Sequence, residues 1–224
     1  TTSENRFKYL GTAQFSALLE VLKAHHRHDE CGVLIEFLLH IQVMLARDQE
    51  VRLGREKDVE SALLITSAMR NFLTVGVAYY GCKLLVTRGV YFQSSHPQQL
   101  EEVCRCLLDV WDAQSAHPDV VVMTASAVAT CSGMESEFPP TLALRLANNI
   151  YRGLSNNTTS ERIVHQMCYA IYMAVRHEAK VVLNQRGTVE LLCELLRHRE
   201  GAQRDILQAL TKLCSSKKLD FDLF

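Results

Sequence analysis

The sequence predicts an all-α fold in which about four to five helical repeats stack into one right-handed superhelix. Glycine (10) and proline (4) are scarce among the 224 residues, and the apolar residues are mainly Leu, Val and Ala. This composition favours helices over sheet, where β-branched and aromatic residues alternate with polar ones. Apolar stripes at helical spacing also recur at a nearly constant period, which is the mark of a repeat architecture.

Five apolar stripes mark the first helix of each predicted unit. Phe15, Leu18, Leu19 and Leu22 stand at i, i+3, i+4 and i+7, which places them along one side of a helix. The same phase begins again at positions 59, 100, 143 and 189, so the stripes start 44, 41, 43 and 46 residues apart. Stacked two- and three-helix repeats have periods of roughly 40 to 47 residues.

Further apolar runs lie between these stripes, and each is predicted to form the helix that covers its predecessor. They span residues 33–45, 69–80, 120–131, 163–175 and 206–214. The longest, 120–131, is too short to cross a bilayer, so no membrane insertion is expected.

Glycine, proline and short polar segments predict where the helices end. Turns are expected at Gly11, Gly89 and Gly187, and helices are expected to begin close after the prolines at positions 97, 118 and 139–140. Proline is tolerated there because its missing N–H has no partner in a first turn. The segment 155–159 is predicted to be an interhelical turn, with capping by Ser155, Thr158 and Thr159.

The distribution of charge argues against nucleic-acid binding, and the cysteines indicate a reducing compartment. Lys and Arg (24) balance Asp and Glu (25) and are scattered, so the sequence shows no basic face for nucleic acid. The eight cysteines form no CxxC pair and mostly lie among apolar residues, which predicts buried free thiols in a reducing compartment, the cytoplasm or the nucleus. The alternative is a disulfide framework.

Segments that approach known chemical motifs are better explained by structure. The stretch 76–83 (GVAYYGCK) approaches a phosphate-binding loop, but Cys82 displaces the lysine, and we interpret it as a helix with two small residues for close contact. His25, His26 and His28 are interpreted as a helix C-terminus favoured by the helix dipole, with a zinc pair as the alternative. We therefore expect no cofactor, no metal and no catalysis; an enzyme with an unrecognised site is the remaining alternative.

The stretch Lys180–Cys214, KVVLNQRGTVELLCELLRHREGAQRDILQALTKLC, resembles one repeat of the armadillo/HEAT-like family. It has a short helix, an Arg-Gly break, a second helix, a connector containing Gly201 and a third helix. KLLVTRGV at 83–90 is similar to its start, whereas 91–133 diverges.

The resemblance implies that the third helices line a concave groove where asparagines clamp an extended peptide. On that basis the expected binding residues are Arg70, Asn71, Asn149, Arg152 and Lys212, with Tyr151, Arg176 and Gln208 as weaker candidates. The chain has one tryptophan, Trp111, with Ser115 four residues later, and so lacks the W-x-x-x-N arrays of importin-α-type receptors.

The expected organisation is a repeat domain over residues 1–218 followed by an acidic and aromatic segment, 219–224. Leu219, Phe221 and Phe224 suit either presentation to a partner protein or folding back onto the last repeat. The expected function is a non-catalytic adaptor or scaffold, of the kind used in cytoskeletal, trafficking or signalling assembly, that binds a protein or peptide partner. The alternative is an oligomerising regulatory module of a larger protein, as in formin-like armadillo regions.

Overall fold

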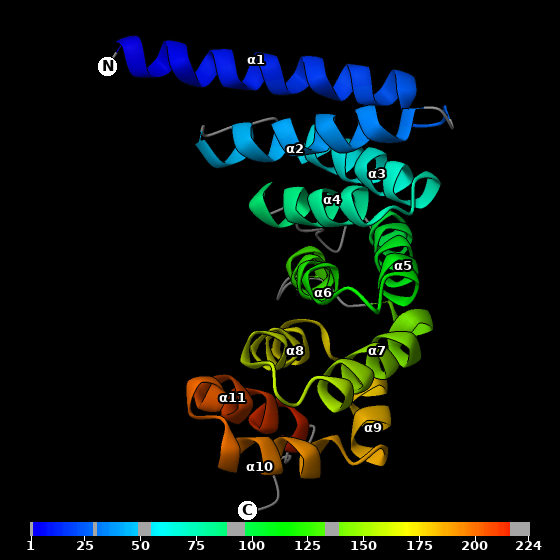
Figure 1. Cartoon of the computed structure of the whole chain (residues 1–224), viewed down its shortest axis with the longest axis vertical. Helices are drawn as coiled ribbons and strands as arrows, with labels where there is room; N and C mark the ends of the chain where they lie inside the picture. The colour runs from blue at the N-terminus through cyan, green and yellow to red at the C-terminus, as the bar shows by residue number, and fades with distance from the viewer. Residues whose placement is uncertain (1, 29–30, 49–54, 89–96, 133–138, 216–224) are drawn as a thin grey trace, which may run out of the picture.

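The computed structural model describes residues 2–28, 31–48, 55–88, 97–132 and 139–215, and within these ranges the chain is all-helical (Figure 1). No strand occurs in those ranges, so the all-α prediction is confirmed. The helices are α1 (Thr2–His25), α2 (Gly32–Asp48), α3 (Arg55–Asn71), α4 (Val75–Arg88), α5 (Pro97–Ala113), α6 (Pro118–Ser132), α7 (Ala143–Asn156), α8 (Glu161–Ala174), α9 (His177–Gln185), α10 (Thr188–His198) and α11 (Gln203–Cys214).

The helices stack in two parallel rows. The first row contains α1, α3, α5, α7, α9 and α10, and the second row contains α2, α4, α6, α8 and α11. Each helix of the second row packs on the preceding first-row helix in the chain and on its neighbours in the second row, of which α2 and α11 at the two ends have one each. Figure 1 shows the pairs following one another from α1 and α2 at one end to α10 and α11 at the other.

The predicted period corresponds to this arrangement. The five apolar stripes lie on α1, α3, α5, α7 and α10, which all belong to the first row. Their side chains enter one continuous core, in which Phe15, Leu107, Leu146 and Leu192 are each fully buried. The spacing of the stripes therefore identifies five helices that lie in the same row.

The middle of the stack is α6. Eleven of its fifteen residues are buried, because α4, α5 and α8 all pack against it. Its buried residues are valines, alanines and other small side chains, which allow neighbouring helices to approach closely.

Ion pairs join equivalent helices of successive pairs. Lys23 of α1 binds Glu60 of α3 at 2.9 Å. In the same way Arg145 of α7 binds two carboxylates of α5, Asp109 at 2.9 Å and Asp112 at 2.6 Å. These side chains are partly or largely exposed, so solvent screens the ion pairs and each of them contributes little to stability.

The segment 76–83 is helical, as predicted, and both of its glycines lie at close contacts. A Cβ on Gly76 would overlap the carboxylate of Glu36 in α2. A Cβ on Gly81 would lie 2.6 Å from Met69 Cγ in α3 and closer still to its sulfur. The two small residues therefore let α4 approach both of its neighbours.

Three local predictions were wrong. Gly11 lies inside α1 and opens no turn, since a helix tolerates an isolated glycine at a cost of about 1 kcal/mol. The run 69–80 is divided between α3 and α4, because Thr74 Oγ1 accepts a hydrogen bond from the backbone N–H of Val77 and starts a new helix. The cap of α8 is Ser160, which accepts from Ile163 N, and not one of the three residues expected.

The last unit has the predicted helix order. The break between α9 and α10 contains Gly187, whose φ of 75° is in the left-handed region that glycine adopts without a steric cost. Gly201 lies in a three-residue 3-10 segment, Glu200–Ala202, that leads into α11. This unit has three α-helices, whereas the preceding pairs have two.

Candidate functional site

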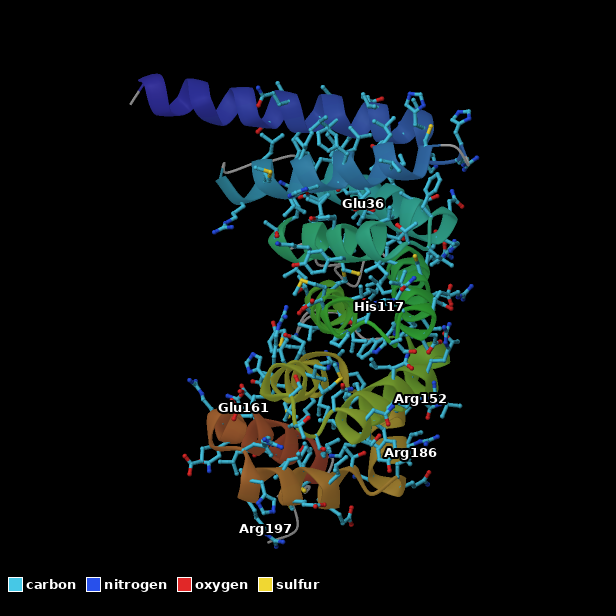
Figure 2. The ribbon with its side chains drawn as sticks, in the orientation of Figure 1. Glu36, His117, Arg152, Glu161, Arg186 and Arg197 are labelled. Carbon is cyan, nitrogen blue, oxygen red and sulfur yellow. The ribbon has the colours of Figure 1, made fainter. Side chains whose placement is uncertain are left out.

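The binding residues predicted from the sequence do not lie on one surface. Arg70 and Asn71 are on α3, and Asn149 and Arg152 are on α7, so all four belong to the first row. Lys212 is on α11, in the second row. In Figure 2, Arg152 lies on the α7 side of the stack, whereas Glu161 marks the opposite side, where α8 and α11 lie.

Two of these four residues are engaged in packing. Asn71 donates its side-chain amide to the backbone carbonyl of His26 at 2.8 Å. Asn149 is only 4% exposed, and its amide nitrogen has no acceptor among the described atoms. A buried side chain cannot hold an extended peptide on the surface, so Asn149 is unavailable in this conformation.

The other first-row candidates have local contacts. Arg70 is exposed and lies 3.9 Å from Glu102 of α5. Tyr151 is half-buried, and the guanidinium of Arg186 lies 5.7 Å from its ring centroid. Arg152 is exposed.

The remaining predicted binding residues, Leu219, Phe221 and Phe224, lie outside the described residues.

One groove brings second-row candidates together. It has a volume of about 670 Å³ and runs along α11, where it is bounded on the α8 side by Tyr172. Lys212 and Gln208, both predicted, line it. The side chains of Tyr172 and Leu207, which are 40% and 52% exposed, give it an apolar floor.

The groove is basic. Of the described residues that line it, Arg204 and Lys212 are charged, Tyr172 and Leu207 are largely apolar, and the others are neutral and polar: Gln203, Gln208, Thr211 and Ser215. The acidic residue nearest in sequence, Asp205, is paired at 2.7 Å with His165 of α8. Among the residues that the structure describes, no carboxylate lines the groove to balance its positive charge.

The pKa of Lys212 is lowered, first by burial of its ammonium and then by the positive charges of Arg176 and Lys180. Arg176, a weaker candidate, therefore lies within electrostatic range of Lys212. Each of these causes disfavours the charged form of Lys212. A bound carboxylate would reverse that effect, so the groove is electrostatically suited to an anionic ligand.

Helix α9 holds the end of the groove in place. Lys180 donates a hydrogen bond to the carbonyl of Ser215, directly after α11. Asn184 donates to the carbonyl of Leu213 at 3.3 Å. These bonds satisfy carbonyls that a helix C-terminus leaves without intrahelical partners.

The sequence reasoning missed Tyr172, Arg204 and Leu207. A signal for Leu207 was present, because the buried stripe of α11 is Ile206, Ala209 and Leu213, and Leu207 falls outside it. An exposed large apolar residue on an amphipathic helix is ordinary when it stands alone. It indicates a contact site when it lines a groove, as Leu207 does.

A second cleft, between α1 and α3, is smaller and already neutralised. Its volume is about 60 Å³, and both charge signs line it, including the paired Lys23 and Glu60. It therefore has less room for a ligand than the groove along α11. The charges of Lys23 and Glu60 already neutralise each other.

All eight cysteines are free thiols, which contradicts the disulfide alternative. Five of them are buried, as predicted, whereas Cys193 and Cys214 are exposed. Burial raises the pKa of Cys82, Cys104, Cys106 and Cys168 to about 12, and that of Cys131 well above its ordinary value. A nucleophilic cysteine needs the opposite shift.

The histidines at the end of α1 have structural contacts. The rings of His25 and His28 lie 5.8 Å apart, and His26 Nδ1 lies 2.8 Å from the carbonyl of Lys23. Over the described ranges, no group of three or more His, Cys, Asp or Glu side chains is arranged to hold a metal ion. In the same ranges no helix has both the length and the apolar character needed to cross a membrane.

Comparisons of the chain with protein-family models, with curated proteins and with solved structures found no match in any of the three.

Proposed function

We propose that this chain is a non-catalytic scaffold that binds a partner peptide or helix along the second row of its helices. Its architecture would be an armadillo/HEAT-like right-handed α-solenoid. The packing of each helix pair on the next, at a period of 41 to 46 residues, supports the solenoid. The proposed compartment is the cytoplasm, because buried free thiols are typical of reducing conditions.

The observation that carries this proposal is the groove along α11. It combines exposed apolar side chains, Tyr172 and Leu207, with the cationic side chains of Arg204 and Lys212. Peptide grooves use apolar contacts for affinity and a few charges for orientation. A volume of about 670 Å³ accommodates several side chains of a peptide.

The test is selection of peptides from a random displayed library against the purified chain. We expect acidic peptides with large apolar residues, whose affinity falls at least about ten-fold in the Leu207→Glu variant. The matched control is Leu144→Glu, because Leu144 is 56% exposed but lies on α7 in the first row, and this variant should bind normally. Failure to select any peptide, or equal effects of the two variants, would refute the proposed binding surface.

A second candidate is self-association through the terminal pair α1 and α2. Val33, Phe37 and Met44 on α2 are 86%, 60% and 53% exposed, which is unusual for large apolar side chains grouped on one helix. Sedimentation equilibrium of the parent chain and of Phe37→Glu distinguishes the candidates. A dimer that the substitution dissociates would favour self-association, and a monomer at high concentration would exclude it.

A further inference from the structure

We propose that the segment 219–224 of the chain binds back into the groove along α11 and there competes with the partner peptide. This inference rests on the proposed function, because it assigns a regulatory ligand to the same groove. The segment reads Leu219-Asp220-Phe221-Asp222-Leu223-Phe224 and lies outside the described residues.

Charge complementarity is the first argument. Within the described part of the chain, the charged side chains that line the groove, Arg204 and Lys212, are both cationic. The segment carries two carboxylates, Asp220 and Asp222, and no basic residue. Contact with either carboxylate would also relieve the positive potential that Arg176 and Lys180 create at Lys212.

The alternating pattern of the segment fits the two kinds of contact in the groove. In an extended chain successive side chains point to opposite sides. If the segment binds as an extended chain, Asp220, Asp222 and the terminal Phe224 would project on one side, and Leu219, Phe221 and Leu223 would project on the other. Such a strand can place carboxylates beside Arg204 and Lys212 while its apolar side covers Leu207 and Tyr172.

The connection is long enough for this reversal. Ser215 is both the last described residue and part of the groove lining, so the segment starts at the groove. The nine residues 216–224 span up to about 30 Å when extended. Helix α11, with twelve residues, is about 18 Å long. The segment can therefore turn back and run along the whole of α11.

Because the segment 219–224 belongs to the same chain as the groove, even weak binding is sufficient for it to occupy the groove. A ligand joined by a short connection has an effective concentration of millimolar order at its site. The fixed end of α11, held by Lys180 and Asn184, keeps that connection at the groove entrance. The segment would then act as a built-in competitor that a tighter partner displaces.

The experiment uses a fluorescent synthetic peptide with the sequence LDFDLF and three versions of the 224-residue chain. The first is the parent, the second is Phe221→Ser with Leu223→Ser, and the third adds Leu207→Glu to that double variant. We expect the double variant to bind the peptide at least about ten-fold more tightly than the parent, because its own segment no longer fills the groove. The triple variant should lose binding.

The control for the triple variant adds Leu144→Glu instead of Leu207→Glu, and it should bind like the double variant. Arg204→Glu in the double variant should also weaken binding of the LDFDLF peptide, and this variant tests the charge contact separately from the apolar contact. Circular dichroism melting of each chain verifies that all of them are folded.

The outcomes separate the two proposals. Equal peptide affinity of the parent and the double variant, or no binding to either, overturns the inference. With either of these outcomes, the proposed function stands if library peptides bind the parent chain and lose affinity in the Leu207→Glu variant. If the LDFDLF peptide binds as expected but no library peptide is selected, binding of the segment to the groove stands, whereas its competition with a partner is overturned together with the proposed function.

Discussion

Asn71 donates its side-chain amide to the backbone carbonyl of His26 at 2.8 Å, and so joins the end of α3 to the end of α1. Gln114, 43 residues later, makes the equivalent bond from the end of α5 to the carbonyl of Leu73 at 2.6 Å. Both amides bind a carbonyl just after the preceding first-row helix. A polar bond thus joins neighbouring helix pairs at two places, and at one of them, Asn71, the sequence suggested a peptide clamp.

Replacing Asn71 by Ala should destabilise the fold without affecting peptide binding. The lost bond contributes about 0.5–1 kcal/mol, near the lower end of the usual range because the site is exposed and water can replace the amide. Urea denaturation measures the change, and Gln114→Ala should give a similar or larger loss because Gln114 is more buried. Unchanged stability in both variants would show that these bonds carry no net free energy.

Two glycines of α4 should respond differently to alanine. Gly81→Ala is expected to lower the free energy of unfolding by about 1–3 kcal/mol, because the new methyl group meets the buried Met69 side chain. Gly76→Ala meets only the carboxylate end of Glu36, which can swing away, so the better helix propensity of Ala should leave stability equal or raise it by up to about 1 kcal/mol. Thermal melts of the two variants provide the comparison.

The eight thiols should react in two groups. Cys193 and Cys214 are exposed and should be alkylated by iodoacetamide in the native chain, with Cys31 slower. The five buried thiols should react only after unfolding, as mass spectrometry of labelled peptides will show. Rapid native labelling of Cys82 or Cys131 would contradict the packing around α6.

The same thiols make stability depend on alkaline pH. The pKa of Cys82, for example, is about 12 in the folded chain and 9.0 in its ordinary state, so the unfolded chain releases this proton first. The stabilisation is complete below pH 9 and is lost as pH rises from 9 towards 12. Denaturation midpoints measured between pH 8 and pH 11 should fall, and alanine at Cys82 should reduce the slope.

Lys212→Met should separate binding from stability. Because burial and two like charges lower the pKa of Lys212, the folded chain holds this proton less tightly than the unfolded chain, and the charge opposes folding at pH 7. Removing the charge should raise stability by up to about 0.5 kcal/mol while weakening acidic peptides. The gain should disappear as pH approaches 10.5 and the parent lysine loses its proton.

Lys23→Met is the control for this effect. Its pKa is raised, first by the hydrogen bond to Glu60, so its charge favours the fold and the substitution should bring no gain. Higher stability in both variants would indicate a general benefit of methionine and not relief of charge at Lys212. Equal peptide binding by Lys212→Met would remove this residue from the groove.

The sequence by itself determined that the chain is helical and where equivalent helices recur. The stripe that begins at Phe15 and its successors are local patterns, and a helix must bury such a stripe whatever lies opposite. The small residues at 76 and 81 likewise predicted close helix contacts, because this inference needs only the helical spacing. Gly11 was wrongly predicted to open a turn, because a lone glycine is compatible with a helix. The break at Thr74 was missed, because a threonine cap competes with continuation of the helix only locally.

Only the tertiary structure decided which exposed residues share a surface. Asn71 and Asn149 look as suitable as Lys212 in the sequence, but the alternation of rows places them on the opposite side, one bonded to His26 and the other buried. The groove of Tyr172, Leu207 and Lys212 depends on the distance between α8 and α11, which meet only after the core has formed. Helical periodicity states which side of one helix is polar, whereas a binding surface is assembled from several helices whose rotation is set by packing.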